Sequence, residues 1–459
     1  MRHLLLRTAS PLWRRPLFTL ARISTATCEP TNQRFSVGPD GTVNVDLDFV
    51  EEALGMPAAD GFGWARFEFG QVIGPNQRYT IARKLGWGMH SSTWLALDNM
   101  YISLASKYVA VKALTGHITG LLDKGMAVWE PDALRLLNAG RRTSPHCLQL
   151  LDEFEIQGVG ADGRHHCLVT PVYGGDVRAL HAANMPLPIQ LSKRILLHLL
   201  RGIAYAHSRT IVHTDLKHDN IFYNTTMTTT EIEKWLVHDP PRRHPPEMSK
   251  DGIVHSAVSQ PPPMISIEEA LTRTYVLADF GSGKLATELW TRPALLISLP
   301  TIACGRGRTV TTPSLRAPEV YLGGEWDEKV DIWSFGCLVF EIITCGRLFR
   351  YQTNENLGLD EIEHILLQMI CLTGEDFRAE QLTVCPLAAE YFNADCALKQ
   401  DPEILDWPFE KRIERWSTIV PPAGVTPMAD FMRRCLRLDP MKRPSAEELL
   451  KDPWFEGVK

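Results

Sequence analysis

The eight residues His213-Thr-Asp-Leu-Lys-His-Asp-Asn220 carry the strongest chemical signal in the sequence. Asp215 can accept a proton from a hydroxyl group, Lys217 can neutralise a phosphoryl group during its transfer, and Asn220 can hold a metal ion through its amide oxygen. A polar loop with this order and spacing is improbable by chance. The stretch therefore predicts a loop that supports phosphoryl transfer to a hydroxyl.

The segments on both sides of this loop have regular patterns. Residues 191–207 place apolar side chains three and four positions apart, which predicts a helix before the loop. After it, the apolar run Tyr275-Val-Leu-Ala278 leads into Asp279-Phe-Gly281. A carboxylate at a strand end, followed by a flexible glycine, suits a Mg²⁺ ligand on a movable segment. The tripeptide Asp-Phe-Gly is common in unrelated sequences, so it is informative only because it follows the 213–220 motif.

Two further motifs lie in a β-rich region nearer the N-terminus. Gly86-Trp-Gly-Met-His-Ser91 stands between two predicted strands, and its glycines would let the backbone approach phosphate groups. Lys112 ends the apolar run Tyr108-Val-Ala-Val, where its ammonium group needs an anionic partner such as a nucleotide phosphate. Each has a simpler interpretation, because many hairpins contain two such glycines and a strand-edge lysine can extend into solvent.

The last motif is Ala317-Pro-Glu319, which is followed by Asp331-Ile-Trp-Ser-Phe-Gly336 and, much later, by Arg443. We expect Glu319 and Arg443 to form a buried charge pair. This pair would have a structural role and no part in the chemistry.

In this order and at these distances, the motifs together resemble the set that characterises protein kinases. The resemblance covers roughly residues 79–456. It implies an α+β fold of two lobes, with a small β-rich N-lobe at 79–170 and a larger helical C-lobe at 174–456. It also implies ATP and Mg²⁺ as cofactors and a protein hydroxyl as the acceptor.

Several details are similar to the SR-protein kinase family. They include Leu85-Gly-Trp-Gly88 and His213-Thr-Asp215, where most kinases have Arg in place of Thr214. Asp215 and Asp279 lie 64 residues apart, whereas a compact kinase uses only about 20. The run Leu315-Arg-Ala-Pro-Glu-Val320 resembles the fungal branch of these enzymes. This resemblance implies a serine/threonine kinase whose protein substrate is Ser/Arg-rich.

The resemblance assigns catalytic roles to single residues. Asp215 would orient or deprotonate the substrate hydroxyl, with Lys217 beside the γ-phosphate, and Lys112 would hold the α- and β-phosphates. Asn220 and Asp279 would bind Mg²⁺.

The same resemblance outlines the nucleotide site, in which a backbone carbonyl and an N–H of the segment between the lobes would read adenine. The carbonyl would be that of Pro171 and the N–H that of Tyr173. The residues expected to contact the nucleotide are Leu85, Gly86, Gly88, Ser91, Thr93, Ala110, Lys112, Thr170, Pro171 and Tyr173.

The chain departs from the usual kinase pattern near Lys112. Its acidic partner is either Glu130 or Asp132, because Pro131 favours a helix that begins there and leaves Glu130 at the cap. We favour Glu130. Ser91 replaces the third glycine and Thr93 replaces the usual valine. These departures keep open a pseudokinase that binds nucleotide or partners as a scaffold without phosphoryl transfer.

Thr214 carries a prediction about regulation. The usual arginine at this place binds a phosphorylated activation loop, and threonine cannot form that bidentate pair. We therefore predict activity that does not depend on activation-loop phosphorylation. On this interpretation, an alanine at every activation-loop hydroxyl would leave most activity, the positions being Thr309, Thr311, Thr312 and Ser314.

Outside the core motifs, the chain shows three segments of distinct composition. Residues 1–28 hold five arginines and no acid, which favours a mitochondrial presequence, whereas the family implies cytoplasm and nucleus. Residues 29–78 form an irregular extension with aromatic residues that would pack on the next domain. Residues 224–274 are rich in proline, which predicts an inserted, largely mobile spacer in which 231–236 forms one short helix. The aromatic residues of the extension are Phe62, Trp64, Phe67 and Phe69.

Composition sets the remaining limits. The 459 residues carry a net charge of −6, which gives no indication of direct nucleic-acid binding. No apolar run is long enough to span a membrane. The ten cysteines form no Cys-x-x-Cys pair, so we expect reduced thiols and no structural metal. We also expect a monomer.

Overall fold

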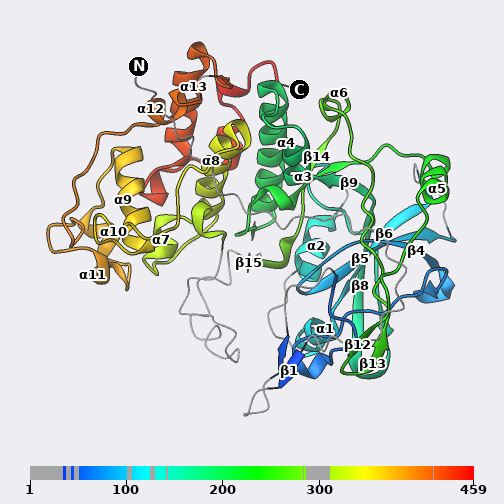
Figure 1. Ribbon diagram of the computed structural model, residues 1–459. Coiled ribbons are helices and arrows are strands. Elements are labelled where there is room, and N and C mark those ends of the chain that lie inside the picture. Colours follow the sequence, from blue (N-terminus) through cyan, green and yellow to red (C-terminus); the bar gives the residue numbers. More distant parts are fainter. Residues whose placement is uncertain are drawn as a thin grey trace, which may run out of the picture.

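A computed structural model of the protein describes residues 51–100, 106–124, 130–140, 143–282, 311–416 and 418–458, together with the backbone of three short strands nearer the termini or beyond residue 282. Those strands are β1 (Phe35–Val37), β2 (Val43–Val45) and β15 (Lys284–Leu285). The basic leader 1–28 and Thr309 lie outside the described residues. Figure 1 shows a lobe of strands beside a lobe of helices.

The N-lobe is built on a six-stranded antiparallel sheet of order β3-β4-β5-β6-β8-β7. The predicted pair of strands around the glycines is the β4–β5 hairpin, with Gly88 opposite Ser91. Tyr79, Trp94 and Val111 belong to the apolar cluster that this sheet buries. The strands are β3 (Val72–Ile73), β4 (Tyr79–Gly88), β5 (Ser91–Asp98), β6 (Tyr108–Leu114), β7 (Asp152–Gln157) and β8 (Arg164–Pro171), and the helices are α1 (Gly116–Asp123) and α2 (Glu130–Asn138).

The C-lobe is helical and holds the larger apolar core. Helix α4 (Ile189–Ser208) follows the predicted periodicity, and α8 (Lys329–Thr344) is buried along nearly its whole length. A helix that is buried on all sides is central, and α4 packs against α8. The remaining helices are α3 (Val177–Ala183), α7 (Pro318–Tyr321), α9 (Glu361–Thr373), α10 (Ala379–Thr383), α11 (Ala388–Tyr391), α12 (Phe409–Glu414), α13 (Pro422–Cys435) and α14 (Ala446–Leu449).

Two small sheets in the C-lobe position the loops that carry the candidate site residues. Strand β10 (Ile211–Val212) pairs with β15, and β11 (Ile221–Asn224) lies between β9 (Tyr173–Asp176) and β14 (Tyr275–Leu277). Ile221 is opposite Leu277 in this register. The loop that ends at Asn220 and the segment that begins at Ala278 therefore leave neighbouring strands at the same edge.

The expectation of a mobile spacer at 224–274 is wrong. The insert contains α5 (Thr229–His238), which includes the predicted short helix, and it continues through β12 (Glu247–Ser249), β13 (Gly252–Val254) and α6 (Ile267–Ala270). It runs as a green ribbon along the N-lobe strands in Figure 1. Prolines disfavour a helix interior but allow extended chain to pack, and Val254, Ser256, Ala257 and Gln260 are buried in such non-helical segments. Ile232 of α5 and Ala270 of α6 are buried as well.

The extension before residue 79 also packs on the N-lobe, as its aromatic residues indicated. Trp64 and Phe67 are buried, and Phe62 and Phe69 are half-buried. Eight cysteines fall within the described residues, and all are free thiols. In the same part of the chain, no helix is both long and apolar enough to cross a bilayer.

Candidate active site

The loop 213–220 is anchored by one buried carboxylate from α8. Asp331 accepts hydrogen bonds from the backbone N–H of His213 at 2.7 Å and of Thr214 at 2.8 Å, and its Oδ2 is 2.9 Å from His207 Nε2. Burial alone would raise the pKa of Asp331, but these donors hold it below its usual value. The Asp331 motif seen in the sequence thus orients the loop.

Asp215 stands at the centre of this loop, half-buried, with the expected partners around it. Its Oδ2 is 2.5 Å from Lys217 Nζ, and its backbone carbonyl accepts a hydrogen bond of 2.8 Å from Asn220 Nδ2. Because the amide nitrogen of Asn220 is engaged in this way, its amide oxygen is the atom left for a cation. The three residues that the first motif singled out are therefore in contact.

Asp279 follows β14 and joins the same cluster. The N–H of Ala278 donates to the Asn220 carbonyl at 2.9 Å, which sets Asp279 beside the loop. Asp279 has a positive φ of 60°, and its side chain is 46% exposed, whereas the next residue, Phe280, is fully buried against the His213 ring at 4.9 Å. A buried phenylalanine thus holds an accessible carboxylate in an uncommon backbone conformation.

Lys112 pairs with Glu130. Its Nζ is 2.6 Å from Oε1 and 2.7 Å from Oε2 of Glu130, and 3.8 Å from Oδ1 of Asp279. Burial would lower the pKa of Lys112, but the two carboxylates raise it. In turn, the charge of Lys112 lowers the pKa of Asp279. Asp279 therefore remains charged at neutral pH next to the lysine.

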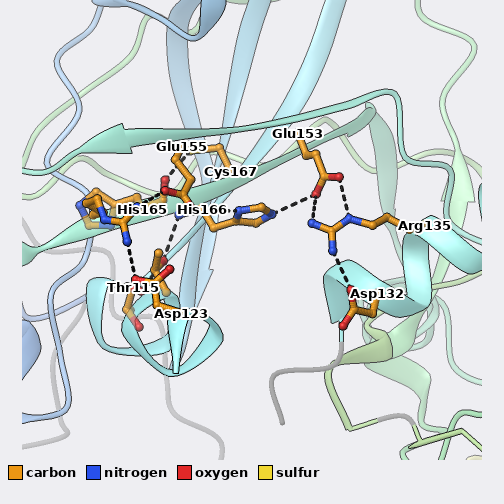
Figure 2. A network of polar contacts seen from close by, with 11 residues as sticks. Thr115, Asp123, Asp132, Arg135, Glu153, Glu155, His165, His166 and Cys167 are labelled. Carbon is orange, nitrogen blue, oxygen red and sulfur yellow. Dashed lines mark hydrogen bonds and ion pairs between the residues drawn. The ribbon is translucent and has the colours of Figure 1, made fainter. Parts of the chain in front are cut away.

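Asp132, the alternative partner of Lys112, points elsewhere. Its Oδ1 is 2.6 Å from Arg135, which also binds Glu153 of β7 at 2.7 Å, and Figure 2 shows this surface network. The helix begins at Glu130 with Pro131 next, as the proline indicated. A glutamate at this first position reaches the lysine, whereas the exposed Asp132 belongs to the outer face of α2.

Several of the residues expected to bind nucleotide are cross-strand neighbours in the N-lobe sheet. Thr93 pairs with both Gly86 and Lys112 in the strand register, and Ala110 pairs with Thr170. A Cβ added to Gly86 or Gly88 would meet no described atom within 4 Å, and neither residue has a positive φ. The protein itself does not require glycine there, so the space suits a ligand that approaches the backbone.

The predicted adenine-reading segment connects the lobes. Pro171 ends β8 in the N-lobe sheet, and Tyr173 begins β9 in the C-lobe sheet, with buried Val172 between them. Leu85 lies on β4 at half-buried depth, and Ser91 opens β5. The chain thus crosses from one lobe to the other at the place where the hinge was expected.

Thr312 is a site residue that sequence reasoning treated only as a phosphorylation candidate. Its hydroxyl donates to Asp215 Oδ1 at 3.5 Å. Thr311 and Ser314 are buried, so a kinase could modify them only after local opening. Replacing all these hydroxyls by alanine would remove the contact to Asp215, and the fourfold variant is therefore the wrong test of phosphorylation. The signal available in the sequence was the position of Thr312, five residues before Ala317.

Thr214 and the pair Glu319–Arg443 were also singled out in the sequence, and both lie in the C-lobe. Thr214 is buried, and its hydroxyl donates to the Ser282 carbonyl at 2.7 Å, so this position carries no cation for a phosphate. Glu319 and Arg443 form the expected buried pair, with N–O distances of 2.6 and 2.8 Å.

A comparison with protein-family models identifies the class to which this arrangement belongs. The family described as "Protein kinase domain" matches residues 79–233 and 253–455. The match covers most of the chain, so the chain belongs to the protein kinase family. The unmatched piece between the two matched parts lies within the insert, from the end of α5 to β13.

Relatives among curated proteins narrow the class. A serine/threonine-protein kinase SRPK of Physarum polycephalum is 27% identical, with 86% of this chain and 89% of the relative covered. A serine/threonine protein kinase of Aspergillus fumigatus is 26% identical, with 87% and 89% covered. SRSF protein kinase 3 of mouse is 24% identical, with 83% and 86% covered. The protein is a serine/threonine kinase that uses ATP and is similar to the SR-protein kinases.

Proposed function

We propose that this kinase transfers the γ-phosphate of Mg²⁺-bound ATP to serines in Ser/Arg-rich protein segments. The observation that carries the proposal is the joined cluster of Lys112, Glu130, Asp279 and Asp215. Phosphoryl transfer by kinases needs the lysine–glutamate pair and the metal-binding aspartate in place together. The scaffold interpretation rested on Ser91, on Thr93 and on doubt about the partner of Lys112, and that partner is present at 2.6 Å.

The residues present fit a magnesium ion. Asn220 offers an amide oxygen and Asp279 an exposed carboxylate, which are the hard oxygen ligands that Mg²⁺ prefers. When bound, the ion would neutralise charge on the ATP phosphates. Lys112, whose Nζ is 3.8 Å from Asp279 Oδ1, would hold the α- and β-phosphates.

Asp215 would orient the substrate hydroxyl and accept its proton as the oxygen bonds to the γ-phosphorus and the bond from that phosphorus to the departing ADP breaks. The Lys217 ammonium at 2.5 Å stabilises the charged carboxylate before transfer and lies close enough to neutralise the transferred group. Thr312, on the other carboxylate oxygen, fixes the rotation of the Asp215 side chain. These contacts keep one oxygen of the acid directed to the acceptor.

The substrate class rests on the relatives and on charge. The name of the mouse relative refers to SRSF proteins. Beyond residue 30 the chain carries a net charge of −10, and a net negative charge attracts arginine-rich segments at long range. Both point to a basic rather than an acidic peptide.

The test measures phosphate transfer from labelled ATP to an Arg-Ser repeat peptide and to a matched Glu-Ser repeat. We expect transfer to the first peptide and a loss of at least about 10³-fold in Asp215→Ala. Asp219→Ala is the matched control, because Asp219 is an acid of the same loop that pairs only with surface Arg178 at 3.0 Å. Equal rates for wild type and Asp215→Ala would contradict the proposal, and a preference for Glu-Ser would contradict the substrate class.

We also infer that residues 1–28 act as a targeting segment, because their arginines and lack of acids favour import into mitochondria. Imaging of the full-length protein beside a version that lacks these residues tests this. Identical distribution of the two proteins would argue against a targeting role.

A further inference from the structure

The glycine loop between β4 and β5 is held by a residue from outside the kinase motifs. The indole Nε1 of Trp64 donates a hydrogen bond of 3.1 Å to the carbonyl of Gly88. Trp64 is only 5% exposed, and its ring contacts Trp87 edge-on with centroids 6.3 Å apart. The Trp64 side chain of the extension thus contacts both the backbone of the loop, at Gly88, and a side chain of the loop, that of Trp87.

Trp64 is itself held in place by the start of α1. The N–H of Gly116 donates to the Gly63 carbonyl at 2.7 Å, and the N–H of His117 donates to the Phe62 carbonyl at 3.1 Å. Gly63 has a φ of +86°, and a Cβ there would lie 2.4 Å from the Asp162 carbonyl oxygen. This backbone fits in one position, so the indole is presented at a fixed place.

The same helix start holds the other end of the loop tip. The N–H of Thr115 donates to the His90 carbonyl at 2.9 Å. The carbonyls of Gly88 and His90 are therefore both engaged on the side of the extension and α1. In a trans peptide the carbonyl and the next N–H point in opposite directions, so fixing the Gly88 carbonyl directs the Met89 N–H away from Trp64.

A glycine loop needs such support, because glycine has more backbone freedom to lose than any other residue. Gly86 and Gly88 have no described atom within 4 Å of where a Cβ would be, so only their strand pairing with Thr93 and Ser91 restrains them from within the loop. The loop would bind phosphate through its N–H groups, and their orientation before binding decides how much entropy the complex loses.

We propose that Trp64 is a positioning residue that pre-orients the glycine loop and so raises the affinity for ATP. The inference rests on the proposed nucleotide site and deepens it. Trp64 does not contact the reacting groups, so it changes ATP binding and leaves the chemical step unaltered. The peptide substrate is unaffected for the same reason.

Trp64→Phe tests this, since it keeps an aromatic ring and removes the N–H donor. We expect the Kd of ATP, measured by calorimetric titration, and the KM for ATP to rise about three- to tenfold. The kcat and the KM for the Arg-Ser peptide should stay within twofold. Trp94→Phe is the control, because it loses an indole hydrogen bond of 2.9 Å in the same lobe, to Ser92 Oγ.

Unchanged ATP affinity in Trp64→Phe, or an equal rise in Trp94→Phe, would overturn the inference while the proposed function stands. A wild-type protein that binds no ATP would overturn the proposed function, and the inference with it. Should Trp64→Phe fail to fold, benzothienylalanine at position 64 gives the same comparison, because it keeps the indole shape and lacks only the N–H.

Discussion

Two lysines on strands that flank β5 show how similar ion pairs can serve different purposes. Lys84 on β4 binds Glu51 at 2.6 Å, Glu52 more closely still and the Ala257 carbonyl at 3.3 Å, and its side chain is 0% exposed. Lys112 on β6 binds Glu130, and its side chain is 24% exposed. The side chain of Lys84 is fully enclosed by protein, whereas that of Lys112 is partly exposed to solvent.

The difference lies in how many donors each ammonium group has already used. An ammonium has three N–H donors, and in Lys84 three acceptors take them, one from the insert and two from the extension. In Lys112 the two short contacts go to a single carboxylate, and the next one, to Asp279, is 3.8 Å long. Lys112 can therefore take a phosphate oxygen, whereas Lys84 fastens three segments together.

The sealed site also divides charge between its two acids. Burial raises the pKa of Glu52. Burial would also raise the pKa of Glu51, but hydrogen bonds from His244, Lys84 and Ser259 lower it to about 2. Glu51 thus stays charged beside the lysine. At Lys112 a single buried carboxylate, Glu130, faces an ammonium group that is itself 24% exposed.

The largest effect should come from Lys112→Met. Loss of a preorganised charge at the phosphates should lower kcat by about 10³-fold, while the melting temperature should fall less than in Lys84→Met, because Lys112 is partly exposed and leaves one buried acid rather than two. Steady-state kinetics and a thermal melt check both halves. A variant that unfolds and keeps its specific activity would reverse the roles assigned to the two lysines.

Lys84→Met should show the opposite pattern. It leaves Glu51 and Glu52 buried without a cation, which costs about 3–5 kcal/mol of folding free energy. Urea unfolding measures this loss, and the folded protein at low temperature should retain its kcat. Adding Glu51→Gln and Glu52→Gln to Lys84→Met should recover much of the stability, since no charge then remains. No recovery in the triple variant would mean that packing rather than charge holds the segments.

Thr312→Ala comes next in size and separates contact from modification. Losing the hydroxyl on Asp215 should lower kcat about tenfold, and Thr312→Ser should restore it. Phosphatase treatment of the wild type should leave kcat unchanged, because Thr214 offers no cation to a phosphate. A large fall after phosphatase treatment, with Thr312→Ala unaffected, would show that phosphorylation is the true requirement.

The two lysines also show what sequence can predict. Lys112, Asp215 and Asn220 could be found because their chemistry imposes a fixed order of residue types within short motifs. The partner of Lys112 was harder to predict, because a helix start at Pro131 left both Glu130 and Asp132 open, and only the folded contacts decide for Glu130. Local rules of spacing were enough for the motifs but not for this pair.

Lys84 could not be found in this way. Its acceptors are Glu51, Glu52 and Ala257, which are far away in the chain and belong to no motif. The insert was misjudged for a related reason, because proline content reports which backbone shapes are excluded and says nothing of whether an extended chain has a surface to pack on. The hydrogen bond from Trp64 to Gly88 could not be predicted from the sequence either, because it is a tertiary contact outside any motif.

The smallest effect concerns Glu341 on α8, a carboxyl buried with far weaker compensation than Glu51 has. Its Oε1 has no hydrogen-bond partner among the described residues, and burial raises its pKa to about 7, with Arg347 opposing. Between its unfolded pKa of about 4.5 and 7 the folded state holds the extra proton, so stability falls as pH rises through this window. Glu341→Gln carries no charge to bury. It should match wild type near pH 4.5 and exceed it by on the order of 1–2 kcal/mol above pH 7. Thermal melts across pH 4.5–8.5 measure the difference, and a gap that stays constant with pH would show that Glu341 does not titrate in this range.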